Sequence, residues 1–214
     1  MARKTGSKGE ETAREIRQAA LSAFARQGYA AVSMRQIAAE IGLQAGALYN
    51  HFVTKQDILR DLMVGHMEEL IEAWHEAAPD SVTPIAALEA FIRFHIRYHA
   101  SRADDVFVSY MELRNLEPEN FREVEALRQR YEACLRDILA AGRRSGEFEI
   151  TDVPVAAMAI IAMLTGVTTW YRSSGRLSIG EVEEIYVAMA LGSVGAGKRA
   201  LQGQKREEAC SRQA

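Results

Sequence analysis

Helical periodicity, scarcely interrupted by proline, constrains the fold of this chain more than any other feature. Apolar residues recur three and four positions apart along most of the sequence, and only four prolines occur in 214 residues. This spacing gives a helix one apolar face, whereas a proline inside a helix removes a backbone hydrogen bond. We therefore predict an all-α protein. The predicted helices cover residues 12–27, 33–41, 44–51, 55–77, 85–101, 104–116, 118–145, 153–171 and 178–192.

Start and stop signals divide the first sixty residues into short helices. Residues 12–15 (TARE) and 33–36 (SMRQ) both match the capping box, in which the first side chain bonds the backbone N–H three residues later. Gly28 and Gly42 each follow a helical run and can adopt the left-handed backbone conformation that ends a helix. The sequence therefore predicts three helices joined by two tight turns.

The segment 33–55 carries the most functional information in the chain. Its two short helices meet at Gly42, with Ile37 and Leu48 placed to face a core shared with Phe24. A tight turn that projects the second helix outward is typical of the helix-turn-helix motif, whose second helix enters the major groove of DNA. The other face of that helix carries small or polar residues, namely Gln44, Ala45, Gly46, Ala47, Tyr49 and Asn50.

This part of the chain resembles the DNA-binding domain of the TetR family of transcriptional regulators. The residues that match are Phe24, Gly28, Tyr29, Ser33, Ile37, Ala38, Gly42, Gly46, Leu48, Tyr49, His51, Phe52 and Lys55. The resemblance implies a homodimer that binds double-stranded operator DNA. One position departs from the family pattern, because Gln44 stands where Ser or Thr, which are better helix caps, are common.

The resemblance also implies which residues contact DNA. The implied DNA-binding residues are Ser33, Arg35, Gln44, Ala45, Gly46, Ala47, Tyr49, Asn50, His51 and Lys55. Arg35 would reach base edges, since arginine can bond guanine through two hydrogen bonds. Tyr49, His51 and Lys55 would contact backbone phosphates. The alternative is structural: Tyr49 would pack against its neighbours, and Lys55 would be an ordinary residue of a first helical turn.

The remaining helices are predicted to form a larger domain. The predicted organisation is a three-helix helix-turn-helix domain at 12–60, a six-helix ligand-binding and dimerisation domain at 61–197, and flexible polar tails at 1–11 and 198–214. In the family the last two helices of each protomer pair in a dimer. Residues 155–169 and 185–193 suit this role because they are rich in small and apolar side chains. The alternative is that they form an internal core.

A second, weaker resemblance concerns the effector. Residues 165–177, with Trp170, Tyr171 and Arg172 followed by Gly175, look like the TetR subgroup that senses acyl-CoA thioesters. This resemblance implies that Arg172 pairs with CoA phosphates and that Trp170 stacks on a ring. The candidate ligand-binding residues are Phe91, His95, Tyr98, Phe107, Met111, Trp170 and Arg172. The alternative is that these side chains belong to the core, that Trp170 packs at a dimer interface and that Arg172 is a solvated charge.

Composition supports a DNA-binding segment on an acidic body. The chain has a net charge of −3, but residues 1–60 hold nine Lys or Arg against five Asp or Glu, a net charge of +4. Cys134 and Cys210 form no disulfide framework, and no apolar run of membrane-spanning length or signal peptide is expected. We therefore predict a cytoplasmic protein that does not associate with a membrane.

No catalytic residue, metal site or cofactor is predicted. The segment 192–199 resembles a phosphate loop but ends in Arg199 where Ser or Thr is needed, and no strand precedes it. His95 and His99 have zinc-compatible spacing, without the glutamate of a metalloprotease motif between them. We predict a transcriptional regulator that a small-molecule effector releases from its operator; a repressor is the main interpretation, and an activator is an alternative that the sequence leaves open. The alternative is a helical ligand-binding protein or enzyme that retains a helix-turn-helix.

Overall fold

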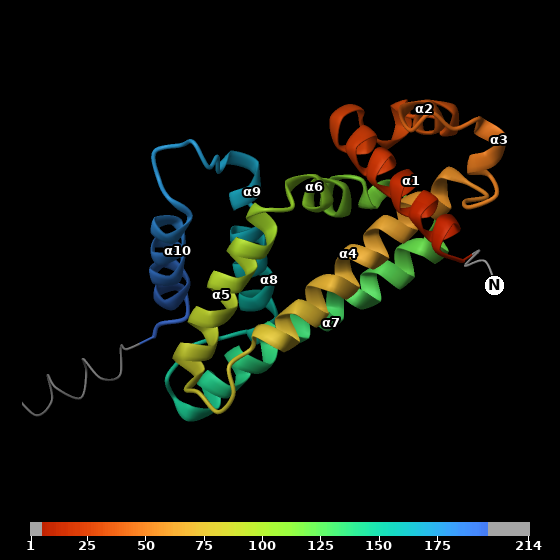
Figure 1. Cartoon of the computed structure of the whole chain (residues 1–214). Coiled ribbons are helices and arrows are strands. Elements are labelled where there is room, and N and C mark those ends of the chain that lie inside the picture. The colour runs from red at the N-terminus through yellow and green to blue at the C-terminus, as the bar shows by residue number, and fades with distance from the viewer. Residues whose placement is uncertain (1–5, 197–214) are drawn as a thin grey trace, which may run out of the picture. The chain divides into compact units, whose positions relative to one another are not determined.

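A computed structural model describes residues 6–196, and every regular element within that range is helical (Figure 1). The N-terminal elements are α1 (Gly6–Gln27), η1 (Tyr29–Ala31), α2 (Met34–Glu40), α3 (Ala45–Leu48) and α4 (Lys55–Ala77). The later elements are α5 (Pro84–Ala100), α6 (Ala103–Met111), η2 (Leu113–Asn115), α7 (Pro118–Ser145), α8 (Val153–Thr165), α9 (Val167–Trp170) and α10 (Ile179–Ser193). The predicted all-α fold is confirmed.

The chain divides into two compact units, and each is described by itself. The first unit holds the described residues up to Leu70 together with 102–128, and the second holds 71–101 together with the described residues from Gln129 onward. Helices α4 and α7 each contribute residues to both units. The predicted functional division at residue 60 therefore differs from the division by compactness, and it remains a proposal.

The first unit has a core built from the faces that the sequence predicted. Helix α1 packs against α2 and α6, and α2 packs against α3. Ile16, Phe24, Ile37 and Leu48 are fully buried and belong to one apolar cluster. Because these side chains come from α1 and from the two short helices α2 and α3 and are removed from water together, their burial is the main term that holds the helices in place.

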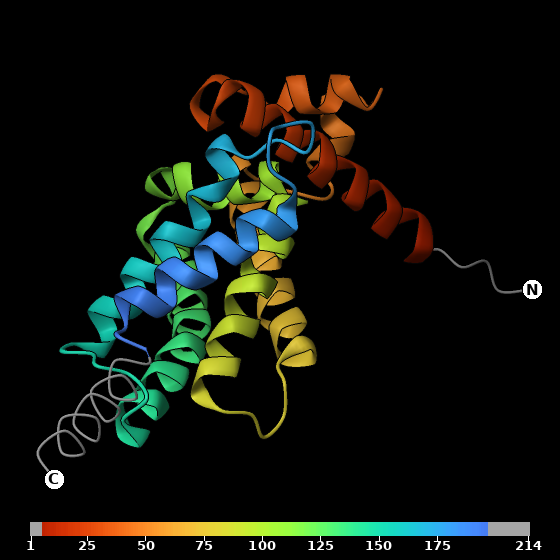
Figure 2. The same cartoon turned by 90° about the vertical axis from the view of Figure 1, so that its left-hand side faces the viewer.

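The second unit is organised around α5. Helices α8 and α10 both pack against it, and α10 lies on the outside of the unit (Figures 1 and 2). The rings of Trp74 and Phe91 meet edge to face with centroids 5.0 Å apart, and Tyr131 lies 5.4 Å from Phe91. Aromatic pairs of this geometry add to the free energy gained by burying apolar area.

A buried ion pair joins α10 to α5. Both carboxylate oxygens of Glu183, which is fully buried, accept hydrogen bonds from Arg97, at 2.5 and 2.7 Å. Arg93 also approaches Glu183 at 3.7 Å and pairs with the exposed Glu184 at 2.8 Å. A charge without water around it must be compensated by such contacts, so these arginines fix the position of α10 on α5.

Several helix boundaries differ from the predictions, among them the end of α3 at Leu48 rather than His51 and the end of α6 at Met111 rather than Leu116. Helix α1 begins at Gly6, upstream of the predicted start at Thr12, so the expected capping box at 12–15 does not start a helix. The single helix predicted over 153–171 is interrupted at Gly166, and two threonine hydroxyls donate to backbone carbonyls three residues earlier, at 2.8 and 2.9 Å. Such bonds compete with the hydrogen bonds of a regular helix. Glycine also has the lowest helix propensity of any residue except proline.

The stretch 153–170 contradicts the expectation that no segment has membrane-spanning length. By length and composition alone this stretch is long and apolar enough to cross a membrane, and only 22% of it is buried. One such helix is weak evidence for a membrane span, because helices of soluble proteins pass the same test. The predicted tail 198–214 lies outside the described residues, as do residues 1–5. The phosphate-loop-like segment 192–199 is described only as far as residue 196.

Replacing Glu183 tests the importance of the buried ion pair. We expect Glu183→Ala to lower the free energy of unfolding by about 1–2 kcal/mol, less than for a fully buried pair, because water can solvate the largely exposed Arg97 once the carboxylate is gone. The matched control is Glu184→Ala, which removes an exposed partner of Arg93 and should leave the urea midpoint near that of the parent. Equal midpoints for the two variants would show that the buried pair contributes no stability.

Candidate nucleic-acid interface

A glycine in a left-handed conformation makes the turn between α2 and α3. Gly42 has φ +67°, and a Cβ built on it would meet no atom within 4 Å. The backbone conformation, rather than lack of space, therefore favours glycine here. The Leu43 N–H donates to the Ala38 carbonyl at 2.8 Å and closes the turn. Helix α3 is thereby directed away from the axis of α2, as the helix-turn-helix prediction requires.

The capping box predicted at 33–36 is confirmed. The Ser33 hydroxyl accepts a hydrogen bond from the Gln36 N–H at 3.3 Å, and the Gln36 side chain accepts one from the Ser33 N–H at 2.8 Å. The cap fixes the start of α2 and leaves Arg35 exposed in its first turn. Arg35 is therefore free of the core and available to an external partner.

Helix α3 is anchored by one side and presents the other to solvent. Leu48 is fully buried and Phe52 is 7% exposed, whereas Tyr49 is 50% exposed. Gln44 occupies the N-cap position without a side-chain capping bond, which places the start of the helix at Ala45. The predicted DNA-contacting residues that are exposed are Ser33, Arg35, Gln44, Gly46, Tyr49, Asn50 and His51, and those that are half-buried are Ala45, Ala47 and Lys55.

Lys55 makes internal contacts that the sequence did not predict. Its ammonium group donates to the carbonyls of Tyr29 and Val32 at 2.8 and 2.7 Å, and it lies 4.1 Å from the centre of the Tyr29 ring. Partial burial lowers the pKa of Lys55, while the nearby Glu112 carboxylate acts to raise it. Lys55 therefore ties the start of α4 to the loop that precedes α2. Its predicted phosphate contact remains a prediction.

The candidate effector-binding residues fall into two separate groups. Phe107 and Met111 belong to the first unit and are 41% and 50% exposed. Phe91, His95 and Tyr98 are buried in the second unit. The structure therefore does not unite these five residues within one compact unit, and their predicted role stays a prediction.

A buried polar network surrounds His95. Its ring nitrogens lie 3.0 Å from the Tyr131 hydroxyl and 3.2 Å from the Thr165 hydroxyl. The ring of His99 stacks on it with centroids 4.0 Å apart and bonds the His95 carbonyl at 2.8 Å. Sequence reasoning missed Tyr131 and Thr165, because only tertiary packing brings residues from α7 and α8 to α5.

Trp170 and Arg172 lie near the end of α9. Trp170 is 48% exposed, and its ring is nearly parallel to that of Tyr186 on α10, with centroids 6.4 Å apart. The Arg172 guanidinium is exposed and donates to the carbonyls of Tyr171 and Thr169 at 2.7 and 3.4 Å. The exposed Arg172 fits the alternative of a solvated charge. The Trp170 contact lies within one chain, so its dimer-interface and ligand roles both remain predictions.

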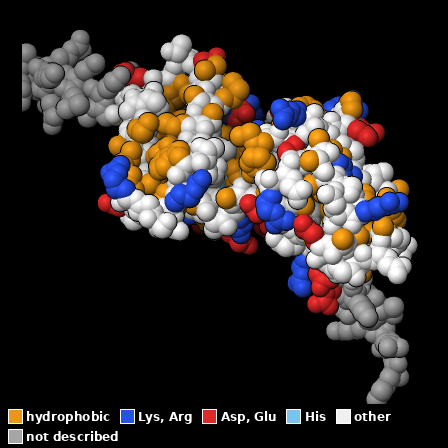
Figure 3. All heavy atoms as spheres, turned by 90° about the horizontal axis from the view of Figure 1, so that it is seen from above, with side chains coloured by type: hydrophobic (Ala, Val, Ile, Leu, Met, Phe, Trp, Pro, Cys, Tyr) orange, Lys and Arg blue, Asp and Glu red, His pale blue; other side chains and the backbone are white. Residues whose placement is uncertain are grey.

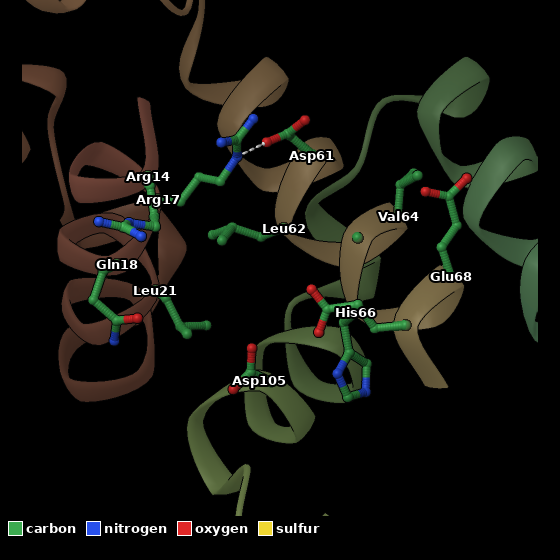
Figure 4. A pocket seen from close by; sticks show the side chains of 12 residues that line it. Arg14, Arg17, Gln18, Leu21, Asp61, Leu62, Val64, His66, Glu68 and Asp105 are labelled. Carbon is green, nitrogen blue, oxygen red and sulfur yellow. Dashed lines mark hydrogen bonds and ion pairs between the residues drawn. The ribbon is translucent and has the colours of Figure 1, made fainter. Parts of the chain in front are cut away.

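The first unit contains a cavity with charged walls and a volume of about 440 Å³ (Figure 4). Residues of α1, α4 and α6 line it, among them Arg17, Asp61 and Asp105, and Arg17 is paired with Asp61. Burial raises the pKa of Asp105, and the negative charge of Glu69 acts in the same direction. Within residues 6–196 no group of three metal-ligating side chains occurs.

Comparison with known proteins identifies the class. Residues 16–62 match the profile described as "Bacterial regulatory proteins, tetR family", and residues 81–194 match "Tetracyclin repressor-like, C-terminal domain". The fold, with its N-terminal helix-turn-helix, thus defines a bacterial transcription regulator. The chain belongs to the TetR family, and it is a regulator rather than an enzyme.

Three relatives illustrate the match. The HTH-type transcriptional repressor KstR2 of Rhodococcus jostii is 25% identical over 189 residues, covering 87% of this chain and 92% of that protein. The fatty acid metabolism regulator protein of Bacillus subtilis is 30% identical over 158 residues, covering 73% and 81%. The structure of AibR "in complex with isovaleryl coenzyme A and operator DNA" has a TM-score of 0.76 at 24% identity, covering 83% and 96%, and shows the shared fold.

Proposed function

We propose that the protein is a transcriptional repressor that binds a pseudo-palindromic operator as a homodimer and is released by a small-molecule effector. The observation that carries this proposal is the exposed, small and polar face of α3, held outward by the Gly42 turn and by buried Leu48. Small side chains let a helix approach the floor of the major groove closely. The membership of the TetR family supports the same function.

Each proposed DNA contact has a chemical role. Arg35 and Asn50 would read bases, since arginine pairs with guanine and asparagine with adenine through two hydrogen bonds. Ala45 and Ala47 would pack on thymine methyl groups. The remaining contacts are assigned to phosphates and to close backbone approach: Ser33, Gln44, Gly46, Tyr49, His51 and Lys55. Phosphate contacts set affinity and register, whereas base contacts set sequence preference.

A homodimer is supported by exposed apolar faces on α8 and α10. Val155 and Met158 on α8 are 56% and 52% exposed, and Ile185 and Met189 on α10 are 45% and 51% exposed. Their spacings of three and four residues place each pair on one helix face. Seen from above, hydrophobic side chains gather over the α9–α10 end of the second unit (Figure 3). Apolar patches of this kind mark interaction sites, and a partner copy would also cover the apolar stretch 153–170.

An acyl-CoA is the effector class that we propose for the second unit. One relative is named for fatty acid metabolism, and AibR, which has the same fold, is described in complex with isovaleryl coenzyme A. Within this unit the candidate residues for the acyl and CoA portions are Phe91, His95, Tyr98, Trp170 and Arg172, whereas Phe107 and Met111 belong to the first unit and their ligand contact stays a prediction. Among them His95 adds a polar centre to an aromatic interior, which suits the mostly apolar character of ligand sites with a few polar groups.

Fluorescence anisotropy on the protein's own upstream DNA tests the function directly. At a fixed salt concentration of about 150 mM, which matters because phosphate contacts make affinity salt-dependent, we expect tight binding that random DNA does not displace. A panel of acyl-CoA thioesters should contain one that releases the operator. Release by none would refute the acyl-CoA assignment, and failure to bind any sequence in a random selection would instead favour a ligand-binding protein without a DNA function.

Two substitutions separate base reading from phosphate contact. We expect Arg35→Ala to weaken operator binding by about 1–3 kcal/mol and to relax preference at one base pair in each half-site. Tyr49→Ala should weaken binding to all sequences alike. The control is Arg14→Ala, which removes an exposed arginine of α1 outside the proposed contact set. If Arg35→Ala kept the parent's sequence preference, Arg35 would be no base-reading residue.

Charge placed on the apolar faces tests the dimer. The parent should elute from size exclusion with light scattering at twice its 23.8 kDa chain mass, since a buried apolar patch is the main source of association free energy. Met158→Glu with Met189→Glu should give monomers and weaken operator binding. Val82→Glu alters another exposed apolar residue outside these helices and should remain dimeric. A dimeric double variant would move the interface elsewhere.

A further inference from the structure

The side-chain amide of Gln56 joins the start of α4 to two other segments. Its nitrogen donates to the Tyr29 hydroxyl at 3.0 Å and to the Asn115 carbonyl at 2.6 Å. Its oxygen accepts from the Glu117 N–H at 3.1 Å and from the Asn120 side chain at 3.5 Å. All hydrogen-bonding groups of this amide are therefore used.

Glu112 makes the second connection between the same segments. Its carboxylate is buried, with 6% of the residue exposed, and it accepts a hydrogen bond from the Tyr29 N–H at 3.2 Å. The other oxygen accepts from the Asn115 side chain. Lys55 supplies the neighbouring positive charge. A buried carboxylate needs such partners, which makes its position specific.

Both connections end at one corner of the helix-turn-helix. Gly28 has φ +80° and ends α1, and Tyr29 begins the short segment that leads to α2. Lys55 holds the same corner through the Tyr29 carbonyl at 2.8 Å. We call residues 112–117, which join α6 to α7, the connector. The corner is thus fixed from α4 and from the connector together.

We infer that Gln56 and Glu112 are positioning residues for DNA recognition, and that the connector controls operator affinity through them. The inference rests on the proposed function and names a point at which it is regulated. A displaced connector would remove the acceptor of the Tyr29 N–H and two partners of Gln56, so the corner would lose its fixed place on α4. Helices α2 and α3 follow the corner in the chain and would lose their orientation with it.

The connector is also well placed to receive a signal from the effector region. It leads directly into α7, a continuous helix whose residues after Arg128 belong to the second unit. There Tyr131 bonds His95, one of the proposed effector-binding residues. Coupling requires an element with two arrangements that both sites bias. The inference assigns this role to the connector, which Leu116 anchors in the apolar core and which polar contacts join to the corner.

Three variants of the full chain test this role. Gln56→Leu removes the amide with little change in size, and Glu112→Gln removes the buried charge. Glu123→Gln is the matched control, because it makes the same chemical change as Glu112→Gln but in a contact between α4 and α7 away from the corner, the pair with Arg60 at 2.5 Å. Operator and random-sequence DNA are titrated at the same salt concentration, and each melting temperature is measured beforehand.

We expect Gln56→Leu and Glu112→Gln each to bind the operator at least about tenfold more weakly, because each removes or weakens hydrogen bonds that hold Tyr29 at the corner. Affinity for random DNA should change much less, since the exposed groups that contact phosphates are still present. Glu123→Gln should bind like the parent. In the double variant, Gln56→Leu with Glu112→Gln, the losses should not multiply, because both substitutions release the same corner.

Several results would overturn the inference. One is operator binding like that of the parent by folded Gln56→Leu and Glu112→Gln. The others are equal losses of affinity for operator and random DNA, or losses of affinity that multiply in the double variant. If Gln56→Leu failed to fold, the milder Glu112→Gln would still decide between these outcomes. If the parent bound no specific sequence, the proposed function would be refuted. If the parent bound its operator and both single variants bound it equally well, only the inference about Gln56 and Glu112 would be refuted.

Discussion

The arrangement of the helix-turn-helix depends on the contacts of the Lys55 ammonium group. An ammonium has three N–H donors, and two of them bond the carbonyls of Tyr29 and Val32 while the charge lies over the Tyr29 ring. These contacts fasten the loop before α2 to the start of α4. Since α2 and α3 are short, their orientation depends on such tertiary contacts more than on their own helical stability.

The two units use buried polar groups in a similar way. Glu112 in the first unit and Glu183 in the second are both buried carboxylates, and both fix one element on another through hydrogen bonds. An apolar core tolerates small slides between helices, whereas a buried charge is stable only where its partners are in place. The positions of the corner before α2 and of helix α10 are therefore fixed more closely than apolar packing alone would fix them. The corner precedes the helices proposed to bind DNA, and α10 is proposed to form the dimer.

Much of the fold, including the geometry of the helix-turn-helix, could be predicted from the sequence. The capping box at 33–36 and the turn at Gly42 depend on local backbone chemistry, and both occur as predicted. The start of α1 and the break at Gly166 were missed, because a helix can extend past one capping signal and because threonine hydroxyls compete for carbonyls only in a specific geometry. The effector-binding set was the least predictable, since aromatic residues serve cores and cavities alike.

The sequence by itself determined the helical class, the helix-turn-helix and the family, because periodicity, capping and turn glycines act over a few residues. Only the tertiary structure decided that Gln56 meets Asn115, that Glu112 reaches Tyr29 and that His95 lies between Tyr131 and Thr165. These pairs are separated by 36 to 83 positions in the chain. Their meeting depends on how whole helices pack, and no local pattern of residues encodes that arrangement.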